Sequence, residues 1–179
     1  MSQWCDSMIA GGFYLWISWS LALLFAVSGF AKIVHAAAFR EHLAAYPFVP
    51  GSLISALAKL LPLMELTLAV GLVFVVACPG ALLAAATLLA AYCAAVGIAW
   101  WMGAGGADCG CGAGSEVPIG GWLLLRNLLL LVFALCGMAL AGHTDGTLAV
   151  HIVAVIGLLG SATVYDWINV FIRSEYETD

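Results

Sequence analysis

The sequence predicts an all-α protein, a polytopic membrane helical bundle with about five transmembrane helices. Of its 179 residues, 65% are hydrophobic and only 8% are charged, a composition far outside that of soluble domains. In water such a chain would expose apolar surface that it could not bury, so lipid is its natural solvent. The length suits one membrane domain over residues 1–179.

Five apolar segments are long enough to cross a bilayer, which takes roughly 20 residues. Residues 1–10 lack the basic start of a signal peptide, so we expect the first segment to remain as an anchor. Pro79-Gly80 and residues 142–146 carry the signals of tight turns. Short turns make the second and third helices, and the fourth and fifth, antiparallel neighbours. The predicted helices cover about residues 12–34, 53–77, 81–102, 119–141 and 147–172.

Two longer connections lie on the same side of the membrane. The first contains a short amphipathic stretch, 36–46, which we expect to be helical and to end before Pro47. The second, residues 103–118, is rich in glycine and holds Cys109-Gly110-Cys111. Aromatic residues are expected to mark the two interfaces. On the side of the cysteine loop these are Tyr46, Trp100, Trp101, Trp122 and Trp167, and on the other side Trp4, Tyr14 and Trp16.

Cys109 and Cys111 are the candidate catalytic residues. A disulfide between cysteines so close in sequence closes a small ring with unfavourable geometry. Strained and exposed disulfides exchange readily with thiols. Asp108 disfavours a neighbouring thiolate, whereas Arg126 or a helix N-terminus near Ile119 would favour one. The pair therefore indicates thiol–disulfide redox chemistry, against the simpler interpretation of two incidental loop cysteines.

A metal site is a second interpretation of the same sulfurs. His35 and His42 lie on the same side of the membrane as Cys109 and Cys111. Two thiolates and two imidazoles would suit zinc or copper. A single histidine at a membrane interface is more often a solvated polar residue, and for each histidine we favour that interpretation.

Charged side chains also occur at membrane depth, namely Lys32, Glu65 and Arg126, the last followed by Asn127. Charges in the hydrocarbon region are costly, so they normally face the bundle interior and pair with one another. We expect Glu65 to form an ion pair with Arg126 or Lys32, and these four residues to support the cysteine loop. The alternatives are a pair that only fixes helix register, or a Lys32 that extends to the interface.

Several of these residues occur in the order and spacing of one membrane-protein family. They are Ser28-Gly29 followed by Lys32, the segment Pro62 to Glu65, the C-G-C loop, and Arg126-Asn127. With them the chain resembles the MauE branch of the MauE/DoxX family of small integral membrane proteins. Family members often read C-G-C-F-G, whereas here Gly112-Ala113-Gly114 follows the second cysteine.

The resemblance implies a multi-pass protein of the bacterial inner (cytoplasmic) membrane that acts in methylamine utilisation. MauE proteins work with MauD, a thioredoxin-like protein, to support the periplasmic, disulfide-rich small subunit of methylamine dehydrogenase, which carries tryptophan tryptophylquinone. For this chain the resemblance implies a thioredoxin-like partner and a client protein with disulfides, in addition to membrane lipid. A periplasmic partner implies that the cysteine loop faces the periplasm. The basic residues point the other way: they fall toward the loop side, which the positive-inside rule places in the cytoplasm.

The sequence therefore predicts a membrane thiol–disulfide redox protein, a thiol–disulfide oxidoreductase if the cysteines turn over. No cofactor is indicated with certainty, although a quinone or a second thiol pair would serve to supply or accept electrons. A net charge of −5 and scattered basic residues argue against a nucleic-acid partner. Two other classes stay open: a non-catalytic membrane assembly or docking factor, and a Cys/His metal-handling membrane protein.

Overall fold

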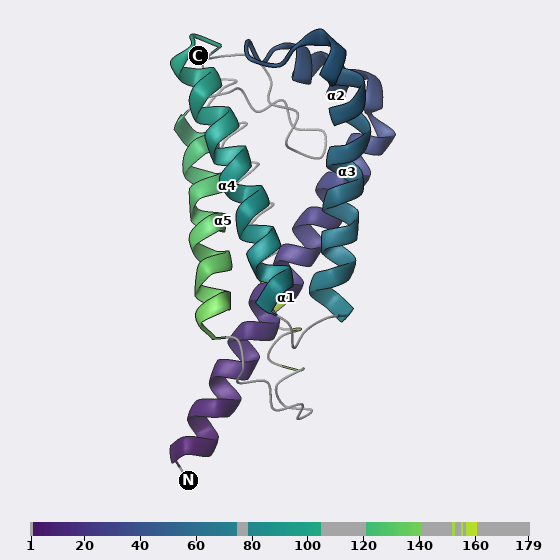
Figure 1. The fold of residues 1–179 in the computed structure, drawn as a ribbon. Helices are drawn as coiled ribbons and strands as arrows, with labels where there is room; N and C mark the ends of the chain where they lie inside the picture. The colour runs from purple at the N-terminus through teal and green to yellow at the C-terminus, as the bar shows by residue number, and fades with distance from the viewer. Residues whose placement is uncertain are drawn as a thin grey trace.

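The regular elements of the described part of the chain are all α-helices (Figure 1). The computed structural model describes residues 2–74, 79–104, 121–140, 152, 155 and 157–160. The helices are α1 (Ser2–Val34), α2 (Ala36–Ala44), α3 (Gly51–Phe74), α4 (Pro79–Trp101) and α5 (Gly121–Ala139). The predicted all-α fold class is confirmed.

Four of these helices are long and apolar enough to cross a membrane. Their ranges overlap the first four predicted segments, and of the fifth, 147–172, the structure describes only residues 152, 155 and 157–160, which are helical. The spans cover Ala10–Val34, Gly51–Phe74, Gly80–Trp101 and Gly121–Ala139.

Two helix starts differ from the sequence prediction. Helix α1 begins at Ser2, ahead of the segment predicted from residue 12, and α4 begins at Pro79 where a turn was expected. Proline suits the first turn of a helix, because the amide hydrogen that it lacks would have no acceptor within the helix there. Proline and glycine together therefore open α4 instead of forming the turn.

The expected amphipathic stretch after the first helix is α2. Its Phe39 and Leu43, one turn apart, are buried and pack in one cluster with Ala58 of α3. Residues four apart share a helix face, so one face of α2 covers the start of α3.

The long helices form two pairs. Helix α1 packs mainly against α3, and α4 packs mainly against α5, while smaller α1–α5 and α3–α4 contacts join the pairs. Helix α2, the end of α4 and the start of α5 lie at the same end of the bundle, the upper end in Figure 1. Ala104 and Gly121, which flank the cysteine segment, therefore lie at the end that carries α2.

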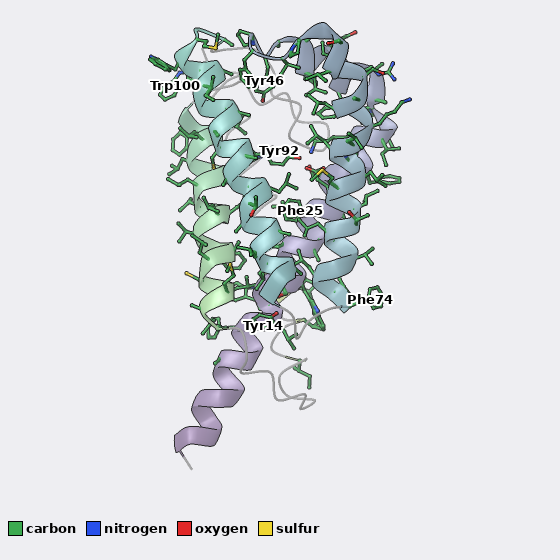
Figure 2. All side chains as sticks on the ribbon, in the orientation of Figure 1. Tyr14, Phe25, Tyr46, Phe74, Tyr92 and Trp100 are labelled. Carbon is green, nitrogen blue, oxygen red and sulfur yellow. The ribbon has the colours of Figure 1, made fainter. Side chains whose placement is uncertain are left out.

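The bundle has a buried interior and an apolar exterior. Leu21, Phe25, Leu72, Leu82 and Leu89 are among its fully buried core residues. Large apolar side chains also point outward from all four long helices (Figure 2). Because exposing such side chains to water is unfavourable, this exterior fits a lipid environment.

The aromatic prediction is correct in part. Trp100, Trp101 and Trp122 are exposed at the end of the bundle that carries α2, as interfacial tryptophans are expected to be. Tyr46 and Tyr14 also lie near the two ends of the bundle (Figure 2), but their rings are buried. Both rings fill contacts between helices, where burial of a large aromatic surface stabilises packing.

Candidate functional site

An ion pair lies inside the bundle. The Nζ atom of Lys32 on α1 is 2.6 Å from Oε1 and 2.8 Å from Oε2 of Glu65 on α3. Lys32 is 5% exposed and Glu65 is 0% exposed. The expected pairing of Glu65 is therefore confirmed with Lys32, and the lysine does not extend to the interface.

Two hydroxyl groups complete this network. Ser28 Oγ accepts a hydrogen bond from Lys32 Nζ at 2.7 Å and donates one to Glu65 Oε1 at 3.3 Å. The phenol of Tyr92 on α4 donates to Glu65 Oε1 at 2.6 Å. The Lys32 ammonium also lies 5.6 Å from the ring centroid of Phe39 and 5.5 Å from that of Tyr92, distances suited to cation–π attraction. The network joins α1, α2, α3 and α4.

The local sequence explains how α1 and α3 bring the pair together. Ser28 and Lys32 are four residues apart and so lie on one face of α1. Gly29 between them lets α3 approach, because a Cβ there would lie 3.1 Å from the Pro62 carbonyl oxygen and 3.2 Å from Glu65 Cβ. Small residues at helix contacts allow such close packing in membranes.

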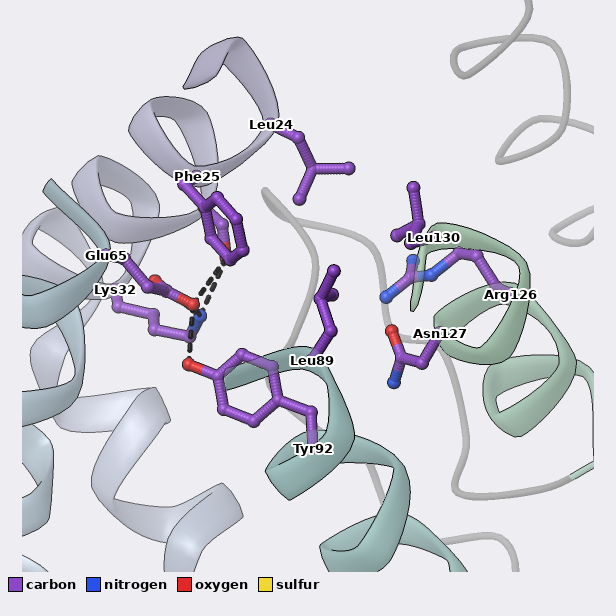
Figure 3. Close-up of a pocket in the computed structure, with 10 residues that line it drawn as sticks. Leu24, Phe25, Lys32, Glu65, Leu89, Tyr92, Arg126, Asn127 and Leu130 are labelled. Carbon is purple, nitrogen blue, oxygen red and sulfur yellow. Dashed lines mark hydrogen bonds and ion pairs between the residues drawn. The ribbon is translucent and has the colours of Figure 1, made fainter. Parts of the chain in front are cut away.

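A cavity separates this network from two polar residues of α5 (Figure 3). It has a volume of about 20 Å³, and Arg126 and Asn127 line it together with Lys32, Glu65 and Tyr92. The Nε and Nη1 atoms of Arg126 and the Nδ2 atom of Asn127 are buried and have no hydrogen-bond partner among the described residues. Arg126 thus does not form the alternative ion pair with Glu65.

The structure brings four predicted site residues to one cavity: Lys32, Glu65, Arg126 and Asn127. Cys109 and Cys111 lie outside the described residues, so their role stays a prediction. Cys93 and Cys136, both within long helices, are free cysteines.

The metal interpretation also stays a prediction, because two of its four ligands lie outside the described residues. His35, which precedes α2, is exposed, and His42 within α2 is half-buried. Within the described ranges, no three His, Cys, Asp or Glu side chains gather closely enough to hold a metal ion.

Sequence reasoning missed three members of the network: Tyr92, Phe39, and Ser28 in its hydrogen-bonding role. Ser28 could have been found from its spacing of four residues from Lys32. Tyr92 is a polar side chain within a helix of otherwise mostly apolar residues, and a buried phenol usually needs a hydrogen-bond partner. No sequence signal indicates the contact of Phe39 with the ammonium.

The fold and this network define a multi-pass membrane protein with a buried charged cluster at its centre. The model of one family, described as "Methylamine utilisation protein MauE", matches residues 11–142. Since this match covers most of the chain, the protein belongs to the MauE family, which confirms the resemblance seen in the sequence. The matched range contains the buried network, Arg126-Asn127 and the cysteine pair.

A curated relative agrees with this assignment. The "Methylamine utilization protein MauE" of Paracoccus denitrificans is 36% identical over 116 residues. The alignment covers 64% of this chain and 62% of the relative. No solved structure matches the chain.

Proposed function

We propose that this chain is a membrane thiol–disulfide redox protein of methylamine utilisation. Cys109 and Cys111 are its reactive pair, and its partner is a thioredoxin-like protein, similar to MauD. Its client is a protein with disulfides, such as the small subunit of methylamine dehydrogenase. It resides in the bacterial inner membrane. Membership of the MauE family and the relative's name support the pathway.

The position of the two flanks of the cysteine segment carries the proposal. Ala104 after α4 and Gly121 at the start of α5 lie at one end of the bundle. By helical rise, Tyr92 lies roughly 14 Å below the end of α4, and Arg126 roughly 8 Å below the start of α5. Flanks at one end of the bundle suit a segment whose thiols must meet a partner protein.

The proposed reaction is reversible thiol–disulfide exchange. One cysteine, as thiolate, attacks a sulfur of the partner's disulfide, so that a mixed disulfide forms and one partner thiolate leaves. The second cysteine then attacks the mixed disulfide, which closes the Cys109–Cys111 disulfide and releases the partner as a dithiol. Two electrons and two protons thus pass from this chain to the partner, and the reverse sequence returns them.

The buried network supports this function by fixing three helices of the bundle. Lys32, Glu65, Ser28 and Tyr92 link α1, α3 and α4 through hydrogen bonds of 2.6–3.3 Å. A charge-assisted hydrogen bond contributes about 1.5–3 kcal/mol, so the network fixes one arrangement of these helices. Because the cysteine segment follows α4, the network keeps that flank in place while the cysteines exchange.

Replacement of the cysteines tests the proposal. Cys109→Ser/Cys111→Ser, expressed in place of the native chain, should abolish growth on methylamine while its amount in the membrane stays unchanged. The single serine variant that lacks the resolving cysteine should accumulate a mixed disulfide with the thioredoxin-like partner, visible on non-reducing gels and lost on reduction. The single variant that lacks the attacking cysteine should not. Cys136→Ser and Cys93→Ser are the matched controls and should leave growth unchanged.

Two other outcomes would reject the redox proposal in favour of another class. If the double serine variant supports normal growth, the protein acts as a docking or assembly factor. If growth is lost and the purified native protein holds stoichiometric zinc or copper that the variant lacks, the cysteines serve metal handling.

A further inference from the structure

The unpartnered donors of α5 form a polar group distinct from the ion pair. They are Arg126 Nε and Nη1 and Asn127 Nδ2, and Asn127 is only 4% exposed. In Figure 3 both side chains point from α5 into the cavity, and Leu89 of α4 lies between them and the ion pair. The group therefore brings three donors to the cavity that have no partner among the described residues.

The nearby carboxylate, that of Glu65, already has several hydrogen-bond partners. Its Oε1 atom accepts from Lys32, Ser28 and Tyr92, and its Oε2 atom accepts from Lys32. Lys32 and Glu65 also neutralise each other. The positive charge of Arg126, which proteins do not deprotonate, is left over, and no second carboxylate lines the cavity within the described residues.

An uncompensated cation at membrane depth is costly, and so is a buried donor without an acceptor. The cavity volume of about 20 Å³ exceeds the roughly 10–15 Å³ that one water molecule needs. A water molecule would satisfy the donors but would leave the positive charge of Arg126 uncompensated. A small anion satisfies both, because charge-assisted hydrogen bonds from a guanidinium are shorter and stronger than neutral ones.

We infer that the Arg126–Asn127 side of the cavity is a binding site for a small monovalent anion. The Arg126 guanidinium supplies the positive charge and a hydrogen bond, and the Asn127 amide supplies another. The ligand carries its negative charge on one or two atoms, as a halide or a small carboxylate does. It comes from solution. The site stands independently of the proposed redox function.

Thermal unfolding of the purified protein in detergent tests the site, with chloride as the probe and gluconate as the reference at constant ionic strength. Chloride should raise Tm in a saturable way, by roughly 5–10 °C at about 100 times its dissociation constant. Arg126→Gln should abolish this rise, whereas Lys59→Gln, which removes an exposed lysine of α3, should keep it. Line broadening of the chloride-35 NMR signal measures chloride binding independently of protein stability.

A second variant keeps the test informative if Arg126→Gln fails to fold. Asn127→Asp places a carboxylate beside Arg126 and so supplies the anion from the chain itself. Its Tm in gluconate should match or exceed that of the native protein in chloride, and added chloride should have no further effect. An unstable Asn127→Asp protein that still responds to chloride would overturn the inference.

Two results would overturn the site. One is a native protein without a saturable response to chloride, and the other is an equal response in the native protein and in Arg126→Gln.

Discussion

Removal of the Lys32 ammonium is the perturbation whose effect the structure defines most closely. Lys32→Met keeps an unbranched side chain of similar length but removes the charge and all three ammonium hydrogens. Glu65, with no exposed surface, then loses its bonds of 2.6 and 2.8 Å to Nζ. It keeps only the hydrogen bonds from Ser28 and Tyr92.

The expected loss of stability follows from those two bonds. Each charge-assisted hydrogen bond contributes about 1.5–3 kcal/mol, which gives roughly 3–6 kcal/mol for both. Breaking a buried ion pair by removing one partner typically costs about 3–5 kcal/mol, because a buried charge is left uncompensated. The two routes agree, so we expect Lys32→Met to lower the free energy of unfolding by about 3–5 kcal/mol.

Removal of both charges should reverse most of this loss. Lys32→Met/Glu65→Leu leaves no uncompensated charge, and replacing a buried pair by apolar residues of similar volume is often neutral. We therefore expect the double variant to be more stable than Lys32→Met. Lys59→Met, at an exposed position of α3, should change the stability by less than about 0.5 kcal/mol.

Reversible unfolding with increasing SDS in mixed micelles, followed by tryptophan fluorescence, measures these differences. A Lys32→Met protein whose unfolding free energy lies within about 0.5 kcal/mol of the native value would show that the ion pair does not stabilise the bundle. A double variant as unstable as Lys32→Met would show that the uncompensated charge of Glu65 is not the source of the loss.

Two further substitutions test the packing and hydrogen bonds around the pair. Tyr92→Phe removes the hydrogen bond of 2.6 Å to Glu65 but keeps the ring, and should lower the unfolding free energy by about 1.5–3 kcal/mol in the same SDS assay. Its control is Thr87→Val, on an exposed face of α4. Equal losses of stability in the two variants would show that the Tyr92 hydrogen bond contributes nothing specific. Gly29→Ala places a methyl group 3.1 Å from the Pro62 carbonyl oxygen and should lower the unfolding free energy by about 1–3 kcal/mol through overpacking. Gly71→Ala meets nothing within 4 Å and should be neutral or stabilising, so a Gly29→Ala protein as stable as Gly71→Ala would show that α1 and α3 do not need this close approach.

The helices could be predicted from sequence because membrane spanning depends on a long, simple signal. About 20 consecutive apolar residues identify a span regardless of its neighbours, and the four long helices overlap the predicted segments. The first residues of α1 and α4 were harder to predict than the spans themselves. Pro79-Gly80 is compatible with both a turn and a helix start, and only the surrounding packing decides between them.

The ion pair could be predicted because charges at membrane depth have few alternatives to pairing. Which cation meets Glu65 could not be predicted, since Lys32 and Arg126 both lie within reach by depth. The choice depends on Gly29, which lets α3 pack closely against α1. It also depends on Leu89, which lies between Arg126 and the ion pair. Such contacts depend on the rotation of each helix about its axis, which a nearly all-apolar sequence barely encodes.

Thiol–disulfide exchange by this protein is best tested through the redox state of Cys109 and Cys111 in living cells. Cells grown on methylamine are quenched in acid, and their free thiols are alkylated. After reduction the remaining thiols receive a second label, so that mass mapping gives the disulfide fraction of the pair. We expect the pair to form a disulfide, and we expect deletion of the thioredoxin-like partner to raise or lower the disulfide fraction strongly. A fraction that does not change without the partner would contradict the proposed exchange.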